Sequence, residues 1–279
     1  MSPLWRDQVR IVLAPQRVAL VRLARGLRPR PTATRVVACP DAAPGDAPWR
    51  RALAALESAL PEFGERPANA VVILSNHFVR YALVPNSEQI GTAAEEQALM
   101  RHSFARVYGD AVERWALRLS DADGAGLRVA SAIDQELRES LRALLAATRL
   151  KLGSIQPGLM TAFNQWRRRV AGSAWLAVVE PGRLCLARLQ DKRWQSLKAL
   201  AIGDDWFGDL AVQLDRESLL TGPAAADVTA PVPVLVYAPG CSEPSPTQLE
   251  ARSMQLLRTL PRAGDPEPVD AAYALAGLG

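Results

Sequence analysis

The sequence predicts an α/β protein of two lobes that share one plan of strands and helices. Near the N-terminus, three extended apolar segments are followed by a helix and a buried strand, and the same order returns after residue 172. A smaller unit of strand, helix and two strands, between 77 and 133, is inserted into the first half. The chain has 279 residues, of which 49% are hydrophobic and 22% charged, a balance typical of a globular protein with a packed core.

The first lobe opens with short β-rich segments. Strands are expected at 9–14, 17–25 and 34–39, a helix at 49–60 and a buried strand at 69–74. Pro15 and Gln16 form a tight turn between the first two strands. Since both faces of the second strand are largely apolar, we expect it to be covered on both sides.

The inserted unit and the return to the first lobe come next. We expect an extended segment at 77–84, a helix at 92–108, a hairpin of 113–119 and 127–133 around a turn at 121–124, a helix at 135–148, a strand at 152–155 and a helix at 158–169. The first lobe is thus predicted to comprise 1–76 and 134–171, and the inserted subdomain 77–133.

The second half repeats the opening order. Strands are expected at 173–180, 183–189, 193–199 and 232–238, and helices at 205–219 and 246–260. Asp204 or Asp205 is the expected N-cap of the first of these helices. The second lobe is predicted to be 172–262, followed by a loosely held tail at 263–279 that is rich in Ala, Gly, Pro and acidic residues.

Charge and cysteine content exclude several classes of protein. The net charge is +4, but the one tight basic cluster, 167–169, ends a predicted helix without interleaved aromatic residues, so no nucleic acid is expected as a partner. Cys39, Cys185 and Cys241 are widely spaced and form no metal pattern, which fits a reducing compartment. No apolar stretch is long enough to span a bilayer. We expect a cytoplasmic protein, peripheral to a membrane only through partners.

Two facing halves of this plan resemble the duplicated actin-like (RNase H-like) ATPase fold. The inserted unit is similar to the subdomain of bacterial actin-like proteins of division and pilus assembly. Three segments resemble platform proteins of type IV pili and type II secretion, either PilM-like proteins or the cytoplasmic domain of GspL-like proteins: 71–85 (VVILSNHFVRYALVP), 101–109 (RHSFARVYG) and 154–166 (SIQPGLMTAFNQW). The resemblance implies binding to the cytoplasmic tail of a bitopic inner-membrane protein, to the assembly ATPase, or to both.

In the fold that the chain resembles, the first hairpin turn of each half holds nucleotide phosphate, and a glycine-rich loop after the last strand holds the adenosine. The first turn here has neither a carboxylate nor a glycine, and Pro15 lacks an N–H donor, which leaves Gln16. The second turn keeps Glu180 and Gly182, and the adenosine loop keeps Gly240. These residues are expected to be vestiges of a nucleotide site.

We therefore expect a non-catalytic scaffold, a pseudo-ATPase with no catalytic residue, no metal and no cofactor. His77 and His102 occur in no catalytic or metal-binding spacing. An ATP-binding actin-like ATPase with degenerate phosphate loops is the alternative, and a regulator that uses its positive charge at a membrane surface is a third hypothesis.

By position in the family it resembles, a partner's tail would lie in a groove between the first lobe and the inserted subdomain, lined by parts of 77–133 and of 152–166. The expected partner-binding residues are His77, Phe78, Arg80 and Tyr81 on a strand, and Arg101, Phe104 and Tyr108 on a helix. The alternative is that Phe78, Phe104 and Tyr108 are core residues. An extended peptide could also add to an exposed strand edge of the subdomain.

Overall fold

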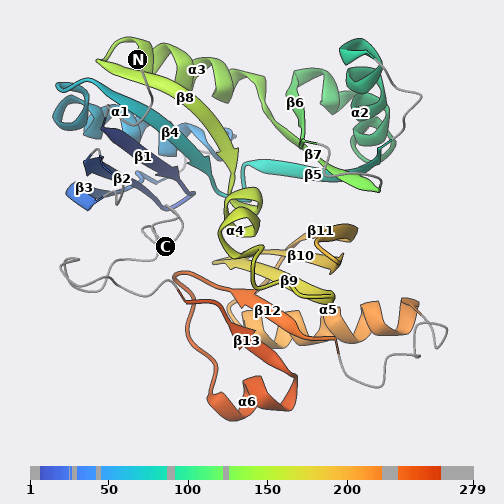
Figure 1. Cartoon of the computed structure of the whole chain (residues 1–279). Coiled ribbons are helices and arrows are strands. Elements are labelled where there is room, and N and C mark those ends of the chain that lie inside the picture. The colour runs from blue at the N-terminus through green and yellow to red at the C-terminus, as the bar shows by residue number, and fades with distance from the viewer. Residues whose placement is uncertain are drawn as a thin grey trace.

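The computed structural model describes residues 7–24, 26, 30–41, 45–86, 92–121, 126–221 and 232–258. Two lobes lie above and below helix α4 (Gly158–Trp166), and a smaller subdomain extends from the side of the upper lobe (Figure 1). The predicted turn at 121–124 falls partly outside the described residues, and the predicted tail at 263–279 lies wholly outside them.

The first lobe contains a five-stranded sheet in the order β3-β2-β1-β4-β8. Its elements are β1 (Gln8–Leu13), β2 (Arg17–Ala24), β3 (Arg30–Ala38), α1 (Arg50–Gly64), β4 (Ala68–Leu74), α3 (Gln135–Ala146) and β8 (Leu150–Pro157). The first three strands form an antiparallel meander, whereas β4 runs parallel to both β1 and β8. Helices α1 and α3 pack on one face of this sheet through a shared apolar cluster.

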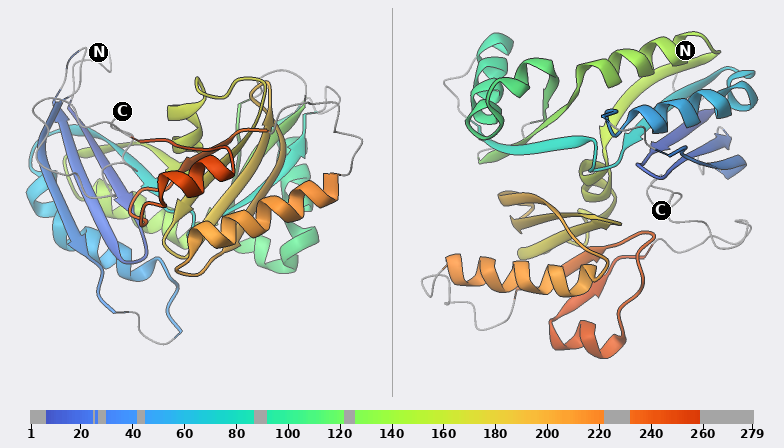
Figure 2. Two further views of the ribbon diagram at one scale, coloured as in Figure 1. Left: turned by 90° about the horizontal axis from the view of Figure 1, so that it is seen from below. Right: turned by 180° about the vertical axis from the view of Figure 1, so that it is seen from behind.

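The second lobe repeats this arrangement strand for strand. Its elements are β9 (Ser173–Glu180), β10 (Arg183–Gln190), β11 (Arg193–Ala201), α5 (Trp206–Thr221), β12 (Val234–Tyr237), α6 (Pro246–Ala251) and β13 (Met254–Leu256). The order β11-β10-β9-β12-β13 matches that of the first lobe, with β12 parallel to β9 and β13. Helix α5 covers the outer face of the sheet (Figure 2), and Asp205 caps it by accepting from the Gly208 N–H at 3.0 Å. The predicted duplication is confirmed.

One element of the second lobe differs from the prediction. A single helix was expected at 246–260, but α6 ends at Ala251 and the chain then forms the short strand β13. Ser253 adopts a positive φ of 51°, which ends the helix, and Met254 to Leu256 pair in parallel with β12. Completion of the sheet overrides the helical propensity of this segment.

The inserted subdomain has the predicted order of strand, helix and two strands. It comprises β5 (Val79–Pro85), α2 (Ala93–Tyr108), a 3₁₀ turn (Gly109–Arg114), β6 (Trp115–Leu119) and β7 (Leu127–Asp134). Helix α2 packs on one face of these strands through Met100 and Phe104. An unpredicted pairing between Leu127 of β7 and Trp194 of β11 continues the sheet of the second lobe into the subdomain.

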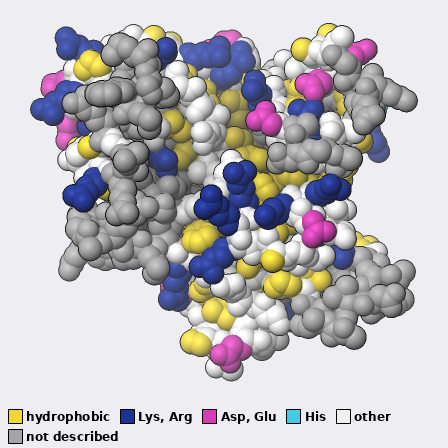
Figure 3. Space-filling view, viewed as in Figure 1, with side chains coloured by type: hydrophobic (Ala, Val, Ile, Leu, Met, Phe, Trp, Pro, Cys, Tyr) yellow, Lys and Arg dark blue, Asp and Glu magenta, His cyan; other side chains and the backbone are white. Residues whose placement is uncertain are grey.

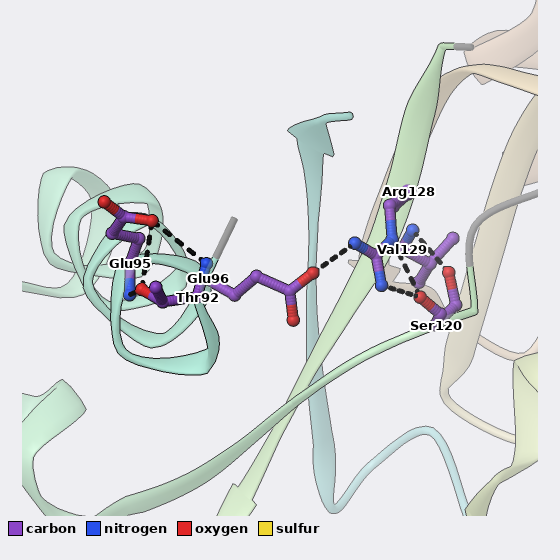
Figure 4. A network of polar contacts seen from close by, with 6 residues as sticks. All are labelled: Thr92, Glu95, Glu96, Ser120, Arg128 and Val129. Atoms are coloured by element: carbon purple, nitrogen blue, oxygen red, sulfur yellow. Dashed lines mark hydrogen bonds and ion pairs between the residues drawn. The ribbon is translucent and has the colours of Figure 1, made fainter. Parts of the chain in front are cut away.

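Polar contacts hold α2 and the β6–β7 hairpin together (Figure 4). Thr92 and Glu95 form a capping box at the start of α2. The next residue, Glu96, accepts from Arg128 Nη1 of β7 at 2.6 Å, and Arg128 also donates to the Ser120 carbonyl from Nε at 2.9 Å and Nη2 at 2.6 Å. The charge of Arg128 is therefore neutralised within the subdomain.

A central core joins the two lobes. It contains Leu159 and Phe163 of α4 together with apolar side chains from both sheets. Val18 and Leu20 of β2 pack toward α1, whereas Ala19 and Val21 of the same strand face this central core. The expectation that the second strand is covered on both sides is therefore met.

Candidate functional site

The three predicted nucleotide loops come together in a cleft between the lobes. A cavity of about 290 Å³ is lined by Gln16 from the β1–β2 turn, Glu180 from the β9–β10 turn and Gly240 from the loop after β12. Arg17 and His77 also line this cleft. The structure brings these three loops together because equivalent strand ends of the two halves face each other.

The Glu180 carboxylate belongs to a buried network of hydrogen bonds. The Ser75 hydroxyl donates to Oε2, while the Asn76 backbone N–H and Nδ2 donate to Oε1 at 2.9 and 2.6 Å. Glu180 is only 3% exposed, and Ser75 and Asn76 are also buried. Ser75 and Asn76 follow β4 of the first lobe, and Glu180 ends β9 of the second, so these hydrogen bonds join the lobes directly.

Asn76 extends the network to the subdomain and to α4. Its Oδ1 accepts from the Tyr81 hydroxyl of β5 at 2.6 Å and from the Leu159 N–H at 2.9 Å. Helix α4 has no cap from its own N-cap residue, Pro157, so Asn76 satisfies one of its free N–H groups. Burial raises the pKa of Tyr81 well above its usual range, with the negative charge of nearby groups adding to the shift, so this hydroxyl stays protonated and donates.

Turn geometry explains the two glycines of the predicted nucleotide loops, of which Gly240 lines the cleft and Gly182 is not among its described lining residues. Gly182 follows Pro181 and Gly240 follows Pro239, and their φ angles are +78° and +79°. Proline followed by a residue of positive φ is the pattern of a type II turn, which favours glycine at the second position. The structure therefore accounts for both glycines without a phosphate.

The cleft fits magnesium and a triphosphate poorly. Pro15 removes a backbone donor from the first turn, and the oxygens of Glu180 already accept three hydrogen bonds. Among the described residues, no three His, Cys, Asp or Glu side chains gather closely enough to hold a metal ion. Gln16 is exposed at the rim, and His77 Nε2 lies 3.0 Å from the Pro181 carbonyl oxygen, to which one tautomer of His77 donates.

A second hollow lies between the first lobe and the inserted subdomain. Its first part, of about 670 Å³, is lined by β6 and β7 on one side and by α3 and β8 on the other. A second part, of about 540 Å³, continues toward α4 and the β10–β11 turn and shares Arg118, Ser131, Ser154 and Pro157 with the first. We call the two parts together the groove.

Two strand edges border the groove. β8 is the last strand of the first-lobe sheet, and β6 pairs only with β7 in the part of the chain that the structure describes. At the end of the β6–β7 ladder, the Ser120 N–H donates to the Val129 carbonyl at 2.8 Å. In an antiparallel pair only every second residue directs its backbone N–H toward the partner strand, so the N–H groups of Leu117 and Leu119 point away from β7. Such unpaired edges can accept an added extended strand.

The groove has an apolar floor and a basic rim. The apolar residues that line it include Ile133, Leu152, Ile155, Met160 and Trp194. Figure 3 shows Lys and Arg side chains gathered over the middle of one face of the molecule, beside hydrophobic surface in the hollow. Among the described residues that line the groove, Asp121 is the only acidic one.

The structure corrects which residues line this groove. The region was predicted correctly in part, since 152–157 and the β6–β7 hairpin border it, but none of the seven expected residues is among the described lining residues. Those residues are His77, Phe78, Arg80, Tyr81, Arg101, Phe104 and Tyr108. Phe78 and Phe104 are buried at 6% and 1% exposure, so the alternative of a core role holds for them.

The remaining five residues lie around the groove or away from it. Tyr81 belongs to the interlobe network and His77 to the cleft. Arg80 Nη1 donates to the His77 carbonyl at 3.3 Å. Arg101 of α2 pairs with Glu113 of the following 3₁₀ turn at 2.9 Å, and Tyr108 stacks edge to face on Trp115 with 5.0 Å between ring centroids. Helix α2 covers the face of the subdomain that carries Ala130 and Ala132, opposite the groove residues Ser131 and Ile133.

Comparisons with known proteins place the chain in the actin-like fold. No family model matches the sequence, and a comparison with curated proteins finds no significant match. The structure is similar to that of a PilM–PilN type IV pilus biogenesis complex, with a TM-score of 0.62 at 14% identity over 91% of this chain and 88% of that one. It is similar to the cytoplasmic domain of EpsL, an inner-membrane component of the type II secretion system of Vibrio cholerae, with a TM-score of 0.54 at 12% identity over 97% and 92% of the chains.

A third similar structure is a Bacteroides thetaiotaomicron protein with an actin-like ATPase fold, with a TM-score of 0.58 at 8% identity over 91% of both chains. These similarities confirm the predicted fold class and the structural resemblance to PilM and EpsL. Within the described residues, no helix has both the length and the hydropathy needed to cross a bilayer.

Proposed function

We propose that this chain is a non-catalytic actin-like scaffold of a type IV pilus or type II secretion assembly platform. In this role it binds the cytoplasmic tail of a bitopic inner-membrane protein, and it also binds the assembly ATPase. The protein would then work at the cytoplasmic face of the inner membrane, held there by its partners. The single observation that carries the proposal is that the nucleotide cleft is bridged by the protein's own side chains, whereas the groove is open.

The interlobe network supports the absence of catalysis. In an actin-like fold a nucleotide would lie between the two lobes, where its phosphates need backbone donors and its metal needs free carboxylates. Among the described residues that line the cleft, Glu180 carries the single carboxylate, and it already accepts hydrogen bonds from Ser75 and Asn76. The cavity of about 290 Å³ that remains is at the lower limit of small-molecule sites.

The groove supports the binding of an extended tail. Its two parts adjoin, an apolar floor runs along them, and the edges of β6 and β8 offer unpaired backbone groups. Main-chain hydrogen bonds would provide affinity and the floor would receive alternate side chains. The similarity to a PilM–PilN complex and to the cytoplasmic domain of EpsL favours a partner that is itself anchored in the inner membrane.

The test is a co-purification with a blocked groove. Ser154 lies on β8 and lines both parts, so Ser154→Trp fills the groove, while Ser58→Trp makes the same change at an exposed position of α1 outside it. We expect the tagged protein to retain a single-span inner-membrane protein and the assembly ATPase from detergent-solubilised membranes of the source cells. Ser154→Trp should lose the membrane protein and Ser58→Trp should keep it. Recovery of neither partner, or equal recovery by both variants, would contradict the proposal.

The alternative is an ATP-binding actin-like ATPase. The observation in its favour is that Arg17 and His77 line the cleft, where a guanidinium or an imidazole can face a phosphate. Saturable binding of Mg·ATP with turnover would support this alternative over the scaffold.

A further inference from the structure

We infer that the segment bound in the groove is acidic, with carboxylate side chains that alternate with apolar ones. This inference rests on the proposed function, because it names the chemistry of the tail that the groove would select. It is carried by the distribution of charge along the groove and by one buried donor that lacks an acceptor.

Unpaired cations line both parts of the groove. Six Lys and Arg side chains face it and form no ion pair within the described part of the chain: Arg118, Arg138, Arg142, Arg167, Lys192 and Arg193. Arg128 also lines the groove, but Glu96 and Ser120 already bind its guanidinium. Asp121 is the only acidic residue among the described lining residues, so the groove has an excess of positive charge that attracts negative charge.

The cations come from opposite walls of the first part. Arg138 and Arg142 lie one turn apart on α3, above β8, while Arg118 lies on β6 of the subdomain. Arg138 Nε is buried and has no hydrogen-bond partner among the described residues. A buried donor without an acceptor is unfavourable, and a carboxylate entering the groove would satisfy it with a charge-assisted hydrogen bond.

The second part carries a separate group of cations. Arg167 follows the end of α4, and Lys192 and Arg193 lie at the tight β10–β11 turn, where Asp191 and Lys192 both have positive φ. Because this turn is a two-residue hairpin, it holds the Lys192 and Arg193 backbone at a fixed place beside α4. A chain that follows the groove would thus meet one cationic group at each end.

Alternation of the bound segment follows from strand geometry. Side chains of an extended peptide point to opposite faces in turn. One row of a strand added to the β6 or β8 edge would face the apolar floor at residues such as Ile133, Leu152 and Met160, and the other row would face the basic rim. A segment in which acidic residues alternate with apolar ones therefore places its acidic row at the basic rim and its apolar row on the floor.

The probe is a fluorescein-labelled peptide of about ten residues in which Glu alternates with Val and Leu. Matched peptides carry Gln or Lys in place of every Glu. Fluorescence anisotropy with the full chain at about 50 mM NaCl should show the Glu peptide binding at least about tenfold more tightly than the Gln peptide, and the Lys peptide not binding. Raising the salt to about 300 mM should weaken only the Glu peptide, because the contacts are partly screened.

Matched variants assign the effect to the groove. Replacing both Arg138→Gln and Arg142→Gln should weaken the Glu peptide by about fivefold or more. Replacing both Arg106→Gln and Arg216→Gln removes the same charge from exposed positions on α2 and α5 outside the groove, and should change binding by less than about twofold.

Each other outcome has a distinct meaning. If all three peptides bind equally and Ser154→Trp abolishes their binding, the groove accepts extended chains but the inference of acidity is overturned. If Ser154→Trp leaves the Glu peptide unaffected, the groove is not the site and the proposed function fails with the inference. If no peptide binds, and the Arg138 and Arg142 variant instead loses binding to phosphatidylglycerol vesicles, the rim serves an anionic lipid surface and the inference is also overturned.

Discussion

The cleft between the lobes and the groove beside the subdomain are both hollows of one actin-like fold, yet their polar groups are used in opposite ways. In the cleft, Glu180, Ser75 and Asn76 satisfy one another across the lobes. In the groove, cations such as Arg138 and Arg142 lack partners among the described residues, and two strand edges are unpaired. The two lobes of this actin-like fold are thus bridged by a buried side-chain network, whereas unpaired polar groups lie at the other hollow.

The largest effect is expected when the bridge itself is removed. Glu180→Ala removes the acceptor of three buried hydrogen-bond donors, which belong to Ser75 and Asn76. We expect the free energy of unfolding, measured by urea titration followed by circular dichroism, to fall by about 3 to 5 kcal/mol.

Two further substitutions control this experiment. Glu180→Gln keeps one acceptor oxygen and should lose less than Glu180→Ala, while Glu243→Ala removes an exposed carboxylate paired with Arg258 and should change stability by less than about 1 kcal/mol. If Glu180→Ala were as stable as Glu243→Ala, the network would not hold the lobes, and the contrast between cleft and groove would be lost.

The next effect concerns the thiol beside the cleft. Burial, with a smaller contribution from the negative charge of Glu180, raises the pKa of Cys241 to about 11. Because the thiolate forms only as the pH rises toward this value, alkylation by iodoacetamide at pH 8 should be about ten- to a hundredfold slower than in a synthetic peptide of 237–245. Its rate, followed by mass spectrometry, should keep rising up to about pH 11.

The Glu180 variant sharpens this second prediction. In Glu180→Ala both causes of the shift become weaker, since the charge is gone and water enters the cleft, so the pKa of Cys241 should fall and its alkylation at pH 8 should become faster. Equal alkylation rates of Cys241 in the protein and in the peptide would contradict this prediction, because they would show that burial does not raise the pKa of the thiol.

The smallest effect is expected at the edge of the network. Tyr81→Phe removes one donor to Asn76 Oδ1, which still accepts from the Leu159 N–H. We expect a loss of about 1 kcal/mol in the free energy of unfolding, whereas Tyr108→Phe at a 37% exposed position should show none. An equal loss in the two variants would mean that the Tyr81 hydroxyl contributes nothing specific to the network.

Much of the fold could be predicted because its strands are apolar runs with turn residues between them. The duplicated order follows from those runs, while the grouping of Gln16, Glu180 and Gly240 was implied by the resemblance to the actin-like fold. The strand β13 could not be predicted, since three residues carry too little pattern and only pairing with β12 defines them. The pairing of β7 with β11 was missed for the same reason, because a single residue pair joins them.

The candidate site was harder to predict than the fold. Ser75 and Asn76 were missed because two small polar residues after a buried strand are also what an ordinary turn contains. The one available signal was their place directly after the apolar run 69–74, opposite the retained acid Glu180. For the groove, the sequence pointed to side chains of 77–81 and of α2, whereas strand alternation places Ser131 and Ile133 on the face opposite α2. The cations of α3 come from a different segment, so local pattern could not join them to the subdomain.

We propose that side chains of the protein take the place of nucleotide between the lobes. Isothermal titration calorimetry of the full chain with Mg·ATP tests it most directly. We expect the titration to show no binding of Mg·ATP with a Kd below about 1 mM, and a parallel phosphate assay to show no hydrolysis. Saturable binding in the micromolar range, lost when Arg17 is replaced by Gln and accompanied by turnover, would contradict the account.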